Sequence, residues 1–222
     1  LKSWTLQSKL DRYFECPEIF ELPVDGNSQN TRWVVYAADG AYQLGQFDGK
    51  AFTPDRPDKT RFNWGNCFYA SQTYSNVPPE DGRRIQIAWG QIGHPDMPFN
   101  QQMNFPVELT LRTTEEGVRL CANPVREVSR LHGKSFALEQ ITLTGGADPL
   151  AGRRGELLHI QAVLEPGDAQ QVVLDLRGAQ IVYDAAAQTL SCRDKQAPLP
   201  AVDGCVQLEI LVDRLSIEIF GN

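Results

Sequence analysis

The chain has 222 residues, of which 41% are hydrophobic and 22% are charged, and its formal net charge is −7. A chain of this length can bury a sizeable core in one or two domains. The negative balance argues against a nucleic-acid partner, because phosphate binding needs a basic footprint. No apolar run approaches the roughly 20 residues that span a bilayer, so we also expect no membrane partner.

The cysteines and histidines favour neither a metal centre nor a cofactor. The five cysteines are an odd number and contain no Cys-x-x-Cys pair, which argues against a zinc site or a disulfide framework. His94, His132 and His159 are far apart in the sequence, and none has a ligand-like neighbour. A glycine-rich phosphate loop is also missing from the sequence. We therefore expect no metal and no cofactor.

Short runs of β-branched and aromatic residues recur along the chain between Gly, Pro, Asn and Asp, which is typical of an all-β protein. In chain order, the expected strands cover residues 31–37, 42–47, 67–74, 84–89, 107–112, 156–164, 171–176, 180–183, 206–212 and 215–220. Asp-Gly pairs predict hairpin turns in the first half of the chain. These pairs are Asp25-Gly26, Asp39-Gly40, Asp48-Gly49 and Asp81-Gly82.

One short helix is predicted between two blocks of strands. Asn123 can cap it, Pro124 suits its first turn, and Val125, Val128 and Leu131 recur on one face. The helix marks a boundary between two domains. We expect a first domain over residues 1–112, a linker with the short helix over 113–135 and a second domain over 136–222.

Glu15 is the first candidate for chemistry, because it lies between the aromatic Phe14 and the thiol Cys16, directly ahead of a proline. A carboxylic acid that must hold its proton near neutral pH needs a partly apolar setting, since desolvation disfavours the charged form. Such an acid can protonate a leaving oxygen, as the general acid of a glycosidase does. From local chemistry alone, the alternative is that Glu15 lies at a strand end near two other surface carboxylates, Glu18 and Glu21.

Two later segments favour the interpretation of Glu15 as a general acid. Residues 66–74 read Asn-Cys-Phe-Tyr-Ala-Ser-Gln-Thr-Tyr, and residues 97–111 contain Phe-Asn-Gln-Gln-Met and Pro-Val-Glu-Leu. Together with Phe-Glu-Cys-Pro at 14–17, these segments resemble glycoside hydrolase family 32, the levanases, inulinases and invertases that cleave β-fructofuranosyl bonds. The resemblance covers nearly the whole chain. It implies an all-β fold in which a partial five-bladed β-propeller precedes a β-sandwich, which we expect to be incomplete.

By this resemblance, Glu15 is the acid/base of a retaining mechanism that uses two carboxylates. The family's nucleophile lies in a Trp-Met-Asn-Asp-Pro-type motif, and a third carboxylate lies in an Arg-Asp-Pro motif. Neither motif occurs in this sequence. We therefore expect the nucleophile to lie outside this chain and the chain by itself to be inactive.

Four further residues are candidates for substrate binding. The family has a sugar-binding carboxylate where Asp39 stands, although Asp39 suits a plain Asp-Gly turn equally well. Cys16 borders the sugar pocket by resemblance, or else fills the core. Trp64 and Trp89 can each offer a flat apolar face to a sugar, although most tryptophans are core residues, and Trp89 is the better candidate.

The main alternative is a non-catalytic carbohydrate-binding β module that keeps only sugar contacts. A third reading, an arabinan-acting propeller enzyme, conflicts with the Phe-Glu-Cys-Pro motif. The resemblance implies a fructan or sucrose substrate and favours an extracellular or periplasmic location. The last strand stops at Gly221-Asn222, so we expect open sheet edges that promote self-association.

Overall fold

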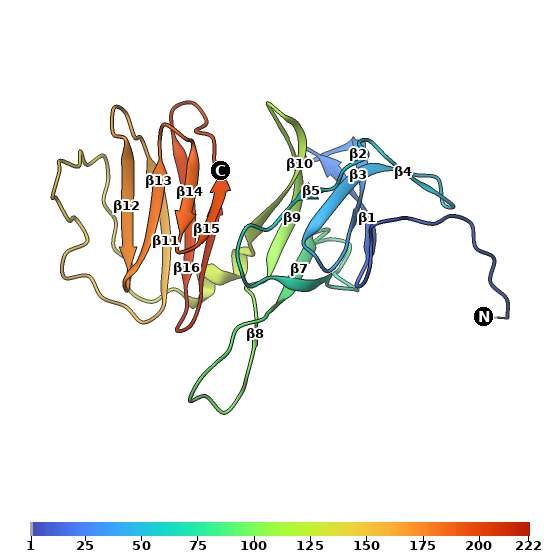
Figure 1. Ribbon diagram of the computed structural model, residues 1–222, viewed down its shortest axis with the longest axis horizontal. Helices are drawn as coiled ribbons and strands as arrows, with labels where there is room; N and C mark the ends of the chain where they lie inside the picture. Colours follow the sequence, from blue (N-terminus) through green and yellow to red (C-terminus); the bar gives the residue numbers. More distant parts are fainter. Residues whose placement is uncertain (1) are drawn as a thin grey trace. The chain divides into compact units, whose positions relative to one another are not determined.

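The computed structural model describes residues 2–222, which form 17 strands and one 3-10 helix (Figure 1). The all-β prediction is therefore confirmed. Contacts divide the chain into two compact units, the first containing residues up to Val125 together with Ser191–Ala197, and the second containing Arg126–Leu190 together with Pro198–Asn222. Within residues 2–222, none of the helical structure is long and apolar enough to cross a membrane.

The first unit contains two antiparallel meanders, each with the strand arrangement of a propeller blade. The first meander consists of β1 (Glu18–Val24), β2 (Asn27–Tyr36), β3 (Ala41–Phe47) and β4 (Phe52–Pro54), with β5 (Thr60–Arg61) beside β3. The second consists of β6 (Tyr69–Thr73), β7 (Arg84–Gly90), β9 (Val107–Thr114) and β10 (Gly117–Pro124), with β8 (Gln102–Met103) beside β7. The chain thus contains part of a propeller.

The two meanders meet at the Asp25-Gly26 turn, where β1 and β9 make a parallel contact. Both turn residues have positive φ, 53° and 72°, as a type I′ hairpin requires. The Asp25 amide donates to the Leu111 carbonyl over 2.9 Å. The Asp25 carboxylate accepts the Thr113 hydroxyl at 2.6 Å and the Thr113 amide at 2.8 Å, and these bonds hold the pKa of Asp25 below its usual range. One predicted Asp-Gly turn therefore also joins two blades.

Glu18 forms a second link between the meanders, so it is not the surface carboxylate considered above. It lies on β1, and its carboxylate accepts the Thr73 amide of β6 at 2.8 Å and the Thr73 hydroxyl at 3.0 Å. The buried Tyr36 of β2 donates its hydroxyl to the same carboxylate. Burial, followed by this hydrogen bond, raises the pKa of Tyr36 well above its usual range. The Glu18 carboxylate therefore connects β1, β2 and β6.

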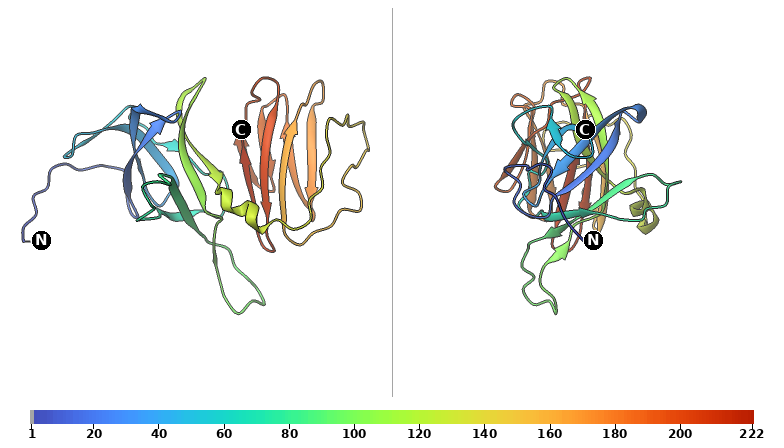
Figure 2. Two further views of the ribbon diagram at one scale, coloured as in Figure 1. Left: turned by 180° about the vertical axis from the view of Figure 1, so that it is seen from behind. Right: turned by 90° about the vertical axis from the view of Figure 1, so that its right-hand side faces the viewer.

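The strands that follow η1 form a sandwich of two sheets, which overlap in Figure 1 and in the view from behind in Figure 2. One sheet contains β11 (Leu158–Leu164), β16 (Val206–Val212) and β17 (Ile217–Gly221), and the other contains β12 (Gln171–Leu176), β13 (Ala179–Asp184), β14 (Thr189–Cys192) and β15 (Lys195–Pro198). Alternate residues of the central β16 are buried, namely Val206, Leu208, Ile210 and Val212. This alternation is expected of a strand with one face in a core.

The helix between the strand blocks differs from its prediction. The 3-10 helix η1 covers Arg126–Leu131, and Asn123 and Pro124 belong to β10. The β9–β10 ladder continues as far as Pro124, so the backbone of Asn123 pairs with Glu108 and does not cap a helix. Val125 and Val128 are buried as expected, whereas Leu131 is 78% exposed. The segment predicted as a linker, 113–135, therefore contains a strand as well as a helix.

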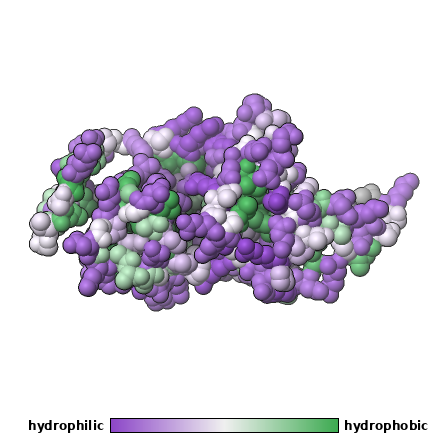
Figure 3. All heavy atoms as spheres, turned by 90° about the horizontal axis from the view of Figure 1, so that it is seen from above, coloured by the Kyte–Doolittle hydropathy of each residue, from purple (hydrophilic) through white to green (hydrophobic). Residues whose placement is uncertain are grey.

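The last strand of the second unit, β17, pairs with β16 at one edge of its sheet. Asn222 extends this pairing, since its amide donates to the Gln207 carbonyl at 3.1 Å and its side-chain oxygen accepts the Gln207 amide at 2.9 Å. On the face drawn in Figure 3, hydrophobic atoms form separate patches within a mainly hydrophilic surface. Self-association through sheet edges stays a prediction.

We expect Glu18→Ala to lower the free energy of unfolding by about 1–3 kcal/mol, because it removes the acceptor of the buried Tyr36 hydroxyl and of the Thr73 amide. Glu21→Ala is the matched control from the same strand. Glu21 is exposed, and within residues 2–222 its one hydrogen-bond partner is the Thr31 hydroxyl, so its loss should change stability by no more than about 0.5 kcal/mol. Urea unfolding of both variants measures the difference, and equal losses would contradict the structural role of Glu18.

Candidate functional site

Three of the predicted site residues, Glu15, Asp39 and Trp89, lie at one end of the two meanders together with Tyr69. Glu15 precedes the start of β1, and Asp39 follows the end of β2. Tyr69 starts β6, and its cross-strand partner is Trp89 near the end of β7. Because neighbouring antiparallel strands start and end at the same edge of a sheet, these four residues share that edge.

Backbone hydrogen bonds through Ala38 fix the distance between the two meanders at this edge. The Ala38 amide donates to the Glu15 carbonyl at 3.0 Å, and the Ala38 carbonyl accepts the Ala70 amide at 3.2 Å. Ala38 therefore lies between Glu15, the candidate acid, and Ala70, which follows Tyr69 in the sequence. The end of β2 works as a spacer between them.

The backbone is unusual on both sides of this spacer. Cys16 has a φ of 48° and Ala70 has a φ of 46°. A β-bulge between Tyr69 and Gln72 accompanies the second of these. Left-handed φ values are uncommon outside glycine, and such conformations concentrate at functional sites. Each of them directly follows a residue whose side chain reaches into the shared edge, Glu15 or Tyr69.

Tyr69 is the central side chain of the site. Its hydroxyl donates a hydrogen bond to Oε1 of Glu15. This bond is the largest cause of a raised pKa at Tyr69, followed by burial and then by the nearby Glu15, Cys16 and Asp39 side chains. The Trp89 ring meets the Tyr69 ring edge-on, with 6.3 Å between centroids. Tyr69 thus contacts Glu15 and Trp89, and Cys16 and Asp39 are close enough for their charges to affect it.

Asp39 fits both roles considered for it. Its Oδ1 accepts the Ala41 amide at 3.2 Å, which is an ordinary turn contact. Its Oδ2 accepts from the Lys59 ammonium group, and about half of the Asp39 side chain remains exposed. Lys59 also donates to the Arg12 carbonyl at 2.9 Å and lies 4.9 Å from the centre of the Tyr13 ring. Burial, and then the charge of Asp39, raises the pKa of Tyr13 to about 12.

The structure does not support every part of the predicted surroundings. Phe14 is 93% exposed and therefore gives Glu15 no apolar cover, and Glu15 itself is exposed. The aromatic neighbours of Glu15 are instead the distant Tyr69 and, behind it, Trp89. Trp64 lies beneath the Arg61 guanidinium, whose central carbon is 4.4 Å from the ring centre, so Trp64 packs with Arg61 and not with Tyr69.

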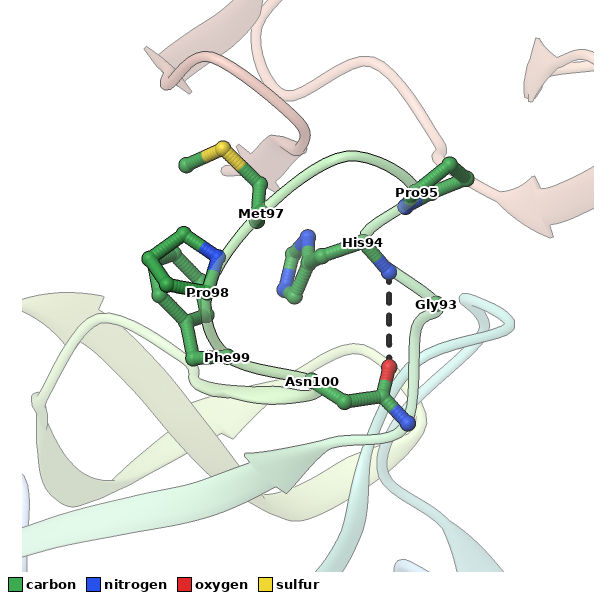
Figure 4. Close-up of a pocket in the computed structure, with 7 residues that line it drawn as sticks. All are labelled: Gly93, His94, Pro95, Met97, Pro98, Phe99 and Asn100. Carbon is green, nitrogen blue, oxygen red and sulfur yellow. Dashed lines mark hydrogen bonds between the residues drawn. The ribbon is translucent and has the colours of Figure 1, made fainter.

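A second polar feature lies in the loop between β7 and β8. Residues 93–100 curl around a hollow of about 520 Å³, and Figure 4 shows the His94 ring inside this curl. His94 is buried, and its ring meets Phe99 with 5.2 Å between centroids. Within residues 2–222, neither ring nitrogen of His94 has a hydrogen-bond partner. No role was predicted for His94 or Tyr69, and the one signal for Tyr69 was its position in the Phe-Tyr-Ala-Ser run.

The described residues, 2–222, contain no group of three or more His, Cys, Asp or Glu side chains arranged to hold a metal ion. The chemistry available at the shared edge is therefore that of a carboxylate with a hydroxyl donor, a second carboxylate and an aromatic face. Such a set can move a proton and can bind neutral polyhydroxylated molecules.

Comparison with known proteins shows which enzymes this chain resembles. Levanase from Bacillus subtilis (strain 168) is 31% identical over 270 aligned positions, which cover 100% of this chain and 40% of levanase. Extracellular exo-inulinase inuE from Aspergillus ficuum is 28% identical and is covered over 51% of its length. This chain therefore spans about half, or less, of the length of these curated relatives.

Solved structures support the same fold. The exo-inulinase of Aspergillus awamori superposes with a TM-score of 0.72 at 24% identity, over 100% of this chain and 53% of the inulinase. A β-fructofuranosidase of Schwanniomyces occidentalis complexed with fructosyl-erythritol also has a TM-score of 0.72, at 21% identity, over 99% of this chain and 55% of that protein. Residues 1–124 match the family described as Glycosyl hydrolases family 32 N-terminal domain, and residues 127–222 match Glycosyl hydrolases family 32 C terminal. The chain belongs to glycoside hydrolase family 32.

Proposed function

We propose that this chain is part of a glycoside hydrolase that cleaves β-fructofuranosyl bonds of fructans or sucrose, with Glu15 as acid/base. The observation that carries the proposal is the hydrogen bond from Tyr69 to Glu15 at the edge where both meanders meet. The levanase and exo-inulinase names of the relatives agree with it. A carboxyl group at an exposed edge, oriented by a hydroxyl, suits proton transfer to a leaving oxygen.

Glu15 has two tasks in a retaining mechanism. As an acid it gives its proton to the departing glycosidic oxygen, and as a base it later takes a proton from the water that releases the fructosyl group. Tyr69 holds Oε1 of Glu15, so Oε2 is the oxygen left to face the substrate. Orientation of this kind matters because proton transfer needs a heavy-atom distance of about 2.6–3.2 Å.

Asp39, Cys16 and Trp89 are the proposed substrate contacts, since each lies around Tyr69. A carboxylate such as Asp39 can accept from two neighbouring sugar hydroxyls. The ring of Trp89 is 38% exposed and can cover the apolar face of a sugar. Trp64, which packs with Arg61, is the weaker candidate of the set.

The second carboxylate of the mechanism is proposed to come from the part of the longer relatives that this sequence does not span. A retaining nucleophile must lie about 5–5.5 Å from the acid/base. The motifs that carry it in the family are not in this chain. An extracellular or periplasmic location is proposed on the same basis, because the matched exo-inulinases are named extracellular.

In the hydrolase of which this chain is proposed to be part, we expect Glu15→Gln to lower kcat on unactivated fructosides by about 10²–10⁴-fold. The amide keeps the shape of the side chain but has no proton to transfer. The variant should largely retain its binding of fructose or inulin, which calorimetry measures. Glu21→Gln serves as the matched control, because Glu21 is an exposed glutamate on the adjacent strand that accepts the Thr31 hydroxyl. Turnover of the Glu15 variant at the rate of the control would exclude Glu15 as the acid/base, whereas sugar binding without turnover by either protein would favour the carbohydrate-binding module.

Tyr69→Phe should cost less than Glu15→Gln, about 10-fold to 100-fold in kcat, because it removes one hydrogen bond to a charged group and leaves the proton donor in place. The comparison is made on the same unactivated substrate and with the same protein. A Tyr69 variant as slow as the Glu15 variant would show that Tyr69 does more than orient the acid.

The purified 222-residue chain should not release fructose from sucrose, inulin or levan, because a double displacement needs the missing nucleophile. Release measured above the level of the same chain carrying Glu15→Gln would place a functional second carboxylate within this sequence.

The titration of Tyr69 gives a test that needs no substrate. The pKa of Tyr69 is raised, so its neutral hydroxyl is favoured, and its hydrogen bond contributes fully below the ordinary tyrosine pKa of about 10 and is lost as the pH rises through the higher folded value. Glu15→Gln should lower the pKa of Tyr69 more than Asp39→Asn does, since Glu15 is the larger cause. Carbon-13 NMR of labelled tyrosine measures both, and an unchanged titration in the Glu15 variant would contradict the contact.

A further inference from the structure

Two histidines that are far apart in the sequence lie side by side in the second unit. Nε2 of His132, just after η1, is 2.7 Å from Nδ1 of His159 on β11. Nε2 of His159 is in turn 2.8 Å from Oε1 of Glu209 on β16. This arrangement corrects the expectation that the histidines have no ligand-like neighbours.

Glu209 determines which nitrogen of His159 carries a proton. A carboxylate can only accept, so Nε2 of His159 must carry the hydrogen that faces Glu209. In neutral His159, Nδ1 is then left with a lone pair that faces His132. Histidines that bind metals show this same pattern, in which one nitrogen coordinates and the other donates to a carboxylate.

We propose that Nε2 of His132 and Nδ1 of His159 together bind one divalent transition-metal ion of the Zn²⁺ type, with water completing its coordination. Imidazole nitrogen is a preferred ligand for Zn²⁺, Ni²⁺ and Cu²⁺. The metal takes the place of the proton that otherwise lies between the two rings. Glu209 supports the site from outside and is not itself a ligand.

The distances allow this with a small movement. Two nitrogens that each lie about 2.0–2.1 Å from a tetrahedral zinc ion are roughly 3.3 Å apart, so the 2.7 Å pair must open by about 0.6 Å. His132 can make this movement because it is exposed and lies outside regular structure. The side chain of His159 is only 13% exposed and is held by Glu209, so it supplies the fixed half of the site.

The bound ion would tie the end of η1 to the β11–β16 sheet. A ligand that binds the folded chain and not the unfolded chain raises stability by mass action. The site lies wholly within the second unit, and therefore its test does not depend on the proposed hydrolase activity.

The experiment uses the 222-residue chain without a histidine tag. Isothermal titration with ZnCl₂ should give one ion per chain, and both His132→Gln and His159→Gln should weaken binding at least tenfold. His94→Gln is the control for a histidine outside the site and should leave the affinity unchanged. His132 is exposed, so its variant stays informative if His159→Gln fails to fold, which circular dichroism reports. Equal zinc affinity in wild-type chain and His132→Gln would overturn the proposal.

Two further measurements identify the ligands. Because cysteines can also bind zinc, the Co²⁺ form is examined for sulfur-to-metal charge transfer in the near ultraviolet, and a site made of two imidazoles and water should show none. Glu209→Gln should weaken zinc binding by about 10–100-fold, as expected for an outer carboxylate. A thiolate band of Co²⁺ that persists in His132→Gln would assign the metal to cysteine and reject the histidine pair.

Discussion

The candidate site depends above all on the hydrogen bonds made by Ala38. Its amide donates to the Glu15 carbonyl and its carbonyl accepts the Ala70 amide, so one residue just after β2 sets the spacing of two blades. With the two backbones held in this way, the Tyr69 hydroxyl reaches the carboxylate of Glu15, although the two residues are far apart in the sequence. The left-handed φ values of Cys16 and Ala70 follow at the two anchored points. At this edge the backbone thus departs from regular strand geometry, and the side chains of Tyr69 and Glu15 come into contact.

Two glutamates three residues apart show how the fold separates structural from chemical roles. Glu18 is already within β1, and its carboxylate is occupied by Tyr36 and Thr73. Glu15 lies before the strand, where it is exposed and shares a single tyrosine hydroxyl. A carboxylate whose two oxygens both accept from protein donors stabilises packing, whereas one with a free oxygen can serve a substrate. Glu15 and Glu18 are the same residue type, so their different roles come from the residues that surround each of them.

Most of the fold could be predicted from the sequence, because long strands with a buried face carry their own alternation. The expected strands at 84–89, 171–176 and 206–212 coincide with β7, β12 and β16 within one residue at each end. Strands of two to four residues, such as β5 and β8, were missed because so short a segment has no period to detect. The longer strands β1 and β10 were missed as well. The helix was placed too early because the Asn-Pro signal of a helix start was overridden by the β9–β10 ladder.

The sequence by itself determined the family and the all-β class and made Glu15 a candidate, because local motifs and the alternation of residues carry this information. Only the tertiary structure decided what Glu15 contacts, since Tyr69 is 54 positions away and their meeting depends on the Ala38 ladder. The same holds for His132 and His159, which are 27 positions apart and meet because η1 ends beside β11. No sequence period encodes such pairs. They arise when separate strands and loops are packed, which is a property of the whole unit and not of any segment.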